Sequence, residues 1–220
     1  MMLNHYDIYY SFDFNKNFAY SLILENSNMF YNVCNQLINQ SQGKEGDWIC
    51  SSNLKSIGFD KLLCVYNYFD LNFSNKKIEN LINSKVLKMI KEQDFIQEFS
   101  KISSLLSEIN NKILSQIDLP ISSSEELTYE NFVKISNFQI DNQIDIDNKL
   151  ITYIDVFVKL KDVNTVVLIS CFDVYSQEQM HQIIKQLNYM GLKVLLINSH
   201  EKYNFLEVEK VIIDQDLCLI

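Results

Sequence analysis

The sequence contains no arginine, because all 19 of its basic residues are lysine. Arginine is the side chain that most often reads guanine edges in DNA, through a bidentate pair of hydrogen bonds. Lysine instead contacts phosphates as a point charge, and phosphate contacts carry no direct sequence information. If the chain binds DNA, we therefore expect it to do so without regard to base sequence.

Glycine and proline are also scarce, with four and one copies among 220 residues. This scarcity disfavours sandwiches, barrels, and collagen-like or low-complexity structure. No uncharged apolar run reaches roughly 18 residues, so no membrane span is expected, and the N-terminus lacks the basic flank and apolar run of a signal peptide. The five cysteines are scattered without a C-x-x-C pair. They favour a reducing cytoplasm over a disulfide framework or a zinc site.

The charge is negative overall and unevenly distributed. A net charge of −9 argues against a general nucleic-acid binder. Residues 76–112, however, hold seven lysines against five acids, whereas residues 113–147 hold one lysine against seven acids. A mildly basic segment thus precedes a strongly acidic one.

Hydrophobic patterning divides the chain into zones at residues 1–60, 61–135 and 136–220. The first zone predicts a half-buried strand over 8–14, a second strand over 19–25 and a helix capped by Asn26 or Ser27. The third predicts alternating helices and strands, with a capping box at Ser176 and Gln179 and a terminating Gly191. Its apolar runs VVLI and VLLI are typical of a buried parallel sheet. We expect an α/β head in which these two zones share one sheet.

The middle zone is helical by period and predicts an insertion in that head. Residues 81–117 run for 37 positions without glycine or proline. This length exceeds that of a typical globular helix, so it predicts either a protruding helical arm or a hairpin of two helices. Pro120 ends the run.

Enzymatic signatures are weak. The turns after the strands at 19–24 and 166–170 have neither the glycines nor the lysine of a phosphate-binding loop. Asp214 and Asp216 form a D-x-D near the chain end, a pattern that some metal-dependent hydrolases place after a strand. A simple strand-end turn explains the same pair and is favoured, so a small hydrolase using Asp214 and Asp216 is the alternative hypothesis.

Four acids gather near the end of the helical run without an intervening lysine: Asp118, Glu125, Glu126 and Glu130. Hard oxygen ligands at this density suit Ca²⁺. A solvated acidic face explains them equally well.

Four lysines fall on one side of the helix predicted from residue 76 onward. At 100° per residue, these lysines share an arc of roughly 120°, opposite the apolar Ile82, Val86, Met89 and Ile90. They are Lys77, Lys85, Lys88 and Lys91. Such a stripe is usually the solvated face of a packed helix, but in a ring-shaped assembly it could line a channel and bind DNA.

Four segments are informative through their order along the chain: SLILENSNMFYNVCNQL, LKSIGFDKLLCVYNYFDLNFSNKKIENLI, the strand–helix–strand stretch 166–205 and VIIDQDLCLI. This order resembles that of the Csn-two (Csn2) family of type II-A CRISPR systems, in its short form. The resemblance implies an α/β head similar to a P-loop fold with a degenerate nucleotide site, and an inserted extended α-helical leg. It also implies a cytoplasmic homotetrameric ring with a lysine-lined channel and calcium at the head–leg junction.

The same resemblance implies a function. The ring is expected to bind the ends of double-stranded DNA without sequence preference, in support of spacer acquisition and antiviral defence. The CRISPR integrase pair and the RNA-guided effector nuclease are the expected protein partners, and no enzymatic activity is expected.

Overall fold

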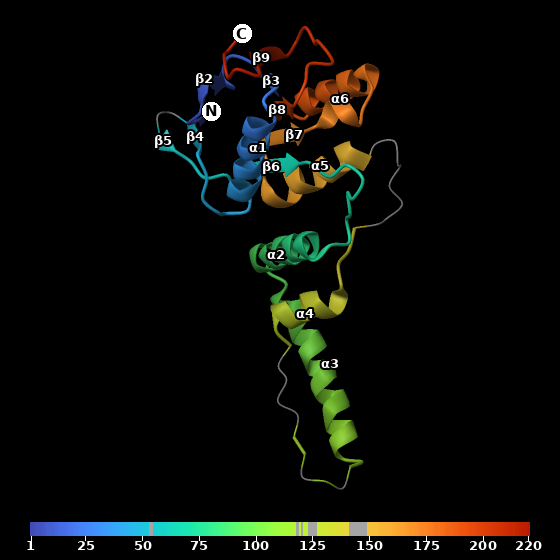
Figure 1. The fold of residues 1–220 in the computed structure, drawn as a ribbon. Helices are drawn as coiled ribbons and strands as arrows, with labels where there is room; N and C mark the ends of the chain where they lie inside the picture. The colour runs from blue at the N-terminus through green and yellow to red at the C-terminus, as the bar shows by residue number, and fades with distance from the viewer. Residues whose placement is uncertain (53–54, 118, 120, 123–126, 141–148) are drawn as a thin grey trace. The chain divides into compact units, whose positions relative to one another are not determined.

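The chain divides into two compact units in a computed structural model that describes residues 1–52, 55–117, 119, 121–122, 127–140 and 149–220. The first unit, here called the head, comprises Met1–Leu71 and Ile144–Ile220, and the second, the helical unit, comprises Asn72–Gln143 (Figure 1).

A five-stranded parallel sheet in the order β6-β7-β8-β3-β9 forms the centre of the head. Its strands are β3 (Ala19–Leu24), β6 (Leu62–Val65), β7 (Thr165–Ile169), β8 (Lys193–Asn198) and β9 (Glu209–Ile213). Leu22 of β3 lies opposite Ile197 on one side and Val211 on the other. The predicted α/β class is therefore confirmed, and so is the sharing of one sheet by the first and last zones.

A smaller antiparallel sheet joins the same core. Its order is β2-β1-β4-β5, formed by β1 (Met2–His5), β2 (Ile8–Asp13), β4 (Trp48–Ser52) and β5 (Lys55–Ser56). The alternation predicted from Ile8 onward is that of β2, whose Ile8 and Phe12 are buried. The indole N–H of Trp48 donates to the carbonyl of Val33 at 3.0 Å, which ties this sheet to helix α1 (Ser27–Ser41).

The helices of the head begin where the sequence predicts. Asn26 caps α1 by accepting the Met29 N–H, and Ser176 with Gln179 forms the predicted capping box of α6 (Gln177–Tyr189). Gly191 follows α6 with a φ of +71°, a left-handed conformation that favours glycine. Helix α6 packs on β8, and α5 (Lys149–Lys161) packs on α6.

Both boundaries differ from the sequence prediction, because the helical unit runs from Asn72 to Gln143 and not from residue 61 to 135. The predicted helical zone begins at residue 61, but Leu62–Val65 forms β6 at the edge of the parallel sheet, with Leu62 opposite Thr165. The head therefore continues to Leu71. A short apolar run such as LLCV cannot be assigned to strand or helix by periodicity alone, because too few residues show the period.

The helical unit contains α2 (Lys76–Glu92), α3 (Ile96–Leu114) and α4 (Tyr129–Ser136). The glycine-free run is thus two helices, separated near Asp94, whose φ is +51°. Ile90, Phe99 and Val133 form a small core between them, and the ring of Phe99 meets that of Tyr129 edge-on at 4.5 Å. No helix in the described part of the chain is long and apolar enough to cross a membrane.

Candidate nucleic-acid interface

The lysine stripe lies on α2, whose apolar side is fixed by the core of the helical unit. Asn75 caps the helix by accepting the Ile78 N–H, and Ile78 and Ile90 are its buried residues. With these two positions facing inward, the side chains of Lys88 and Lys91 remain 69% and 53% exposed. Lys77 is exposed on the first turn and Lys85 is half-buried.

Lys88 and Lys91 of the stripe are paired with described acids. The ammonium of Lys88 lies 3.7 Å from the carboxylate of Glu92, and that of Lys91 lies 3.1 Å from Glu130. Among the described residues, Lys85 has no acidic partner. Exposed ion pairs contribute about 0–1 kcal/mol, so a DNA phosphate can replace either acid at little cost.

Glu130 is the one predicted calcium ligand that the structure describes. It sits in the first turn of α4, after Thr128, whose hydroxyl accepts the Asn131 N–H. The backbone N–H of Glu130 itself and then Lys91 hold the pKa of its carboxyl below the usual range. The pair with Lys91 therefore forms fully at pH values above the ordinary pKa of a carboxyl group. It is lost as the pH falls through the lowered pKa of Glu130, because the carboxylate is then protonated.

The other three predicted ligands, Asp118, Glu125 and Glu126, lie outside the described residues. Within the part of the chain that is described, no three His, Cys, Asp or Glu side chains are grouped closely enough to hold a metal ion. The carboxylate of Glu130 suits Ca²⁺ chemically, but its described partner is a lysine. An ion at this position must compete with Lys91.

Asp214 and Asp216 form a turn at the end of β9. One carboxylate oxygen of Asp214 accepts the backbone N–H groups of Asp216 and Cys218 at 2.9 and 2.8 Å. A side chain that closes its own turn in this way is a structural element of the strand end. The turn interpretation of the D-x-D is therefore confirmed.

The turn after β7, where an α/β protein often holds a phosphate, is filled by protein atoms. Phe172 is fully buried there, and its N–H donates to the side-chain oxygen of Asn198 at 3.1 Å. Burial raises the pKa of the Cys171 thiol in the same turn to about 12, so this cysteine stays protonated at neutral pH. The side chain of Phe172 thus fills the space in which an anion would lie, and its backbone N–H already donates to Asn198 and is not free to bind an anion.

An apolar stripe on α3 is not among the features predicted from the sequence. Of the residues of this helix, all of which the structure describes, only Phe99 is buried. Leu105 and Ile109 are 60% and 52% exposed, and they continue a stripe that also contains Ile102, Leu106 and Ile113. The 3–4 spacing of these residues is a visible signal, but the same spacing is typical of the inward face of a packed hairpin.

The family assignment comes from a comparison with family models. The model described as CRISPR-associated protein (Cas_Csn2) matches residues 40–217 of the 220. The chain belongs to the Csn2 family. No curated protein matches it.

Membership in the Csn2 family confirms the resemblance seen in the sequence and gives the chain a CRISPR-associated role in defence. The matched region includes the whole helical unit, with the α2 lysines and Glu130, as well as β6 to β9 of the head.

Proposed function

We propose that this Csn2 protein binds double-stranded DNA near its ends, without sequence preference, as a homotetrameric ring that supports spacer acquisition. The observation that carries the proposal is the lysine stripe of α2, in which Lys77, Lys88 and Lys91 are exposed, within the matched region of a CRISPR-associated family. Lysine contacts to phosphate give sequence-blind, salt-sensitive affinity. A net negative chain can still bind DNA there, because the local potential governs the encounter.

In this proposal the helical unit acts as the extended leg and the head as a scaffold related to P-loop folds. The filled turn after β7 supports a degenerate nucleotide site, because neither glycines nor a lysine surround an anion there. The protein acts with the integrase pair and the RNA-guided effector nuclease by presenting DNA, not by cutting it. Asp214 does not support the hydrolase alternative, because its carboxylate closes a turn.

Copies of this chain meet, in our proposal, through the apolar stripe of α3. A 19-residue helix with one buried residue has little tertiary support of its own. Contiguous exposed apolar side chains mark interaction surfaces. A second copy offers the same stripe, and two such helices can pack against each other around a two-fold axis.

Closed circular DNA should compete poorly with linear duplex of equal mass. A preassembled ring must be threaded by a DNA end, and a closed circle has none. We expect linear fragments to displace a labelled linear duplex in a gel-shift competition, and relaxed circles to do so much less. If circles compete as well as linear DNA, encirclement is wrong, and the α2 lysines bind phosphates from outside a ring.

Calcium is proposed to stabilise the assembly through Asp118, Glu125 and Glu126, with Glu130 exchanging between Lys91 and the ion. Carboxylates so close in sequence repel one another unless a cation neutralises them. Chelation should therefore lower the melting temperature or dissociate the ring, and the double variant Glu125→Gln with Glu126→Gln should show the same loss without chelator.

The control for the calcium experiment is Lys91→Ala, which frees the carboxylate of Glu130. Removing this competing ammonium should leave calcium binding intact or strengthen it. Equal mass and melting temperature with and without chelator would remove calcium from the proposed function.

A further inference from the structure

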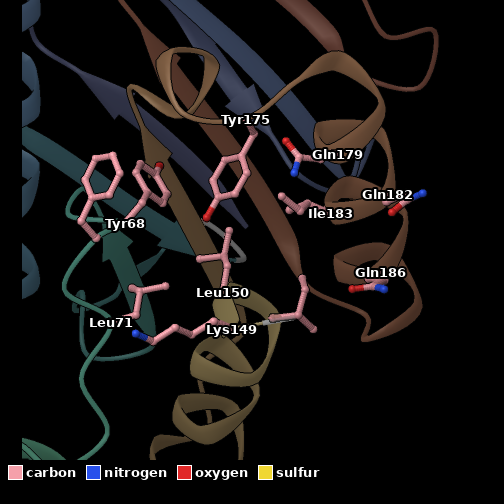
Figure 2. A pocket seen from close by; sticks show the side chains of 11 residues that line it. Tyr68, Leu71, Lys149, Leu150, Tyr175, Gln179, Gln182, Ile183 and Gln186 are labelled. Carbon is pink, nitrogen blue, oxygen red and sulfur yellow. The ribbon is translucent and has the colours of Figure 1, made fainter. Parts of the chain in front are cut away.

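A pocket of about 300 Å³ opens in the head beyond the carboxyl ends of β6 and β7 (Figure 2). Tyr68 follows β6 and Tyr175 follows β7, and their rings meet edge-on with centroids 5.4 Å apart. The buried side chains of Leu150 and Ile183 complete an apolar floor. Crevices beyond the carboxyl ends of parallel strands are the usual ligand sites of α/β sheets.

The polar groups of the pocket stand on two sides. Gln179, Gln182 and Gln186 line it from α6, whereas Lys149, at the start of α5, lies across the pocket beside Leu71 (Figure 2).

Most of these polar side chains make no hydrogen bond or ion pair with the described residues. Gln179 accepts the Ser176 N–H at 2.9 Å. Among the described residues, the side chains of Gln182, Gln186 and Lys149 have no hydrogen-bond or ion-pair partner. None of the described lining residues is acidic. The pocket therefore offers amide edges on one side and a cation on the other.

An aromatic side chain adds a stacking surface. Phe69 lines the pocket and is 85% exposed, so most of its ring is accessible to a ligand. Aromatic rings exposed in this way are surfaces on which nucleobases stack. A simple organic acid would use the lysine and the amides but would leave this ring unused.

We propose that this pocket binds a single nucleotide, with its base against Phe69 and its phosphate at Lys149. The base edge meets Gln182 and Gln186, and because glutamine amides pair bidentately with adenine N6 and N7, adenine is the preferred base. The volume is at the small end of ligand sites, which suits one nucleotide. The nucleotide is either free or the unpaired terminal residue of a DNA strand, and only the second source rests on the proposed function.

The pocket also has a consequence for the chain around it. Its walls include residues 68–71, directly before the helical unit begins at Asn72, and the start of α5, where the described chain resumes after that unit. A nucleotide that contacts both segments restricts the motion of residues 68–71 and 149–151. Hydrogen exchange should therefore slow at residues 68–71 and 149–151 when the pocket is filled.

The test is a calorimetric titration of the full chain with deoxyadenosine monophosphate, deoxycytidine monophosphate, deoxyadenosine and inorganic phosphate. Deoxyadenosine monophosphate should bind most tightly. Phe69→Ala should weaken it by about five- to a hundredfold, the range seen when a base loses its stacking partner. Lys149→Ala should remove the preference for the phosphorylated ligand, and Gln182→Leu with Gln186→Leu should remove the preference for adenine.

Two matched controls lie on α6 outside the pocket. Lys185→Ala removes one positive charge, and Gln177→Leu removes one amide from an exposed position. Neither should change binding, and melting curves on every variant check that the fold is kept. Absence of deoxyadenosine monophosphate binding at millimolar concentration, or binding that the pocket variants leave unchanged, would overturn the proposal.

A second experiment distinguishes a free nucleotide from the unpaired terminal nucleotide of a DNA strand. Blunt duplex is compared with duplex carrying a single 3′ adenine overhang. Tighter binding of the overhang, reversed by deoxyadenosine monophosphate, assigns the pocket to a DNA terminus, whereas equal binding of both duplexes with intact nucleotide binding assigns it to a free nucleotide. Failure of blunt duplex to bind at all would instead contradict the proposed function of the α2 lysines and leave the nucleotide site standing.

Discussion

Replacing Lys85 and Lys88 together with alanine should weaken the binding of linear duplex DNA by about tenfold or more at low salt. Lys88 is 69% exposed and held only by a 3.7 Å pair with Glu92. Lys85 has no acidic partner among the described residues. A homotetramer holds four copies of each lysine, so the double substitution removes several phosphate contacts around one channel.

The salt dependence gives the sharper measurement. Removal of one lysine–phosphate contact should reduce the slope of log affinity against log salt by about 0.9. The double variant should therefore show both lower affinity and a flatter slope, measured by fluorescence anisotropy across a salt series. Because neither lysine belongs to the core around Ile90, Phe99 and Val133, sedimentation should show an unchanged assembly.

The matched control removes the same charge elsewhere. Lys159 and Lys185 are exposed lysines on α5 and α6 of the head. Their double alanine variant should bind DNA as the unaltered protein does. If both double variants bind DNA equally weakly, overall charge and not the α2 stripe governs binding. If the α2 variant binds normally, the channel has been assigned to the wrong face.

Local signals in the sequence predict α1, α6 and the strands β2, β3, β7 and β8 of the head, but not β1, β4, β5 or β6. The caps at Asn26 and Ser176, the turn at Gly191 and the apolar strands all reflect interactions within a few residues. These interactions do not depend on distant parts of the chain, so a single sequence contains them. The position of β3 in the same sheet as β8 and β9 follows from the shared apolar patterning of distant zones.

Features that depend on neighbours distant in sequence are harder to predict. The sequence shows that Glu130 and Lys91 carry opposite charge, but not that the packing of α4 on α2 brings them within 3.1 Å. The pocket has no sequence signal for the same reason, because Tyr68, Lys149 and Gln182 come from three separate segments. The break near Asp94 is equally hidden, because no glycine or proline marks it.

Placing charge on the apolar stripe of α3 should dissociate the assembly. Leu105→Asp with Ile109→Asp exchanges two large apolar side chains, now 60% and 52% exposed, for carboxylates. Full burial of each Leu or Ile stabilises an interface by about 1.5–3 kcal/mol, and a buried unpaired carboxylate costs several kcal/mol more. In a two-fold interface each substitution occurs twice, so the destabilisation is doubled.

The mass of the assembly, measured together with helix content, shows whether the double variant loses the interface or fails to fold. Light scattering at micromolar concentration should show a smaller species for the double variant, while circular dichroism shows that the helices of the head and of the α2–α4 core remain. Ser104→Asp with Asn111→Asp adds the same charge to exposed positions on the opposite side of α3, and this control should keep the full mass. DNA binding should fall with the mass, because a channel formed by several copies of α2 concentrates more phosphate contacts than one copy does. If the α3 variant keeps the mass of the unaltered protein, the copies meet elsewhere, and the exposed stripe of α3 is a surface for a different partner.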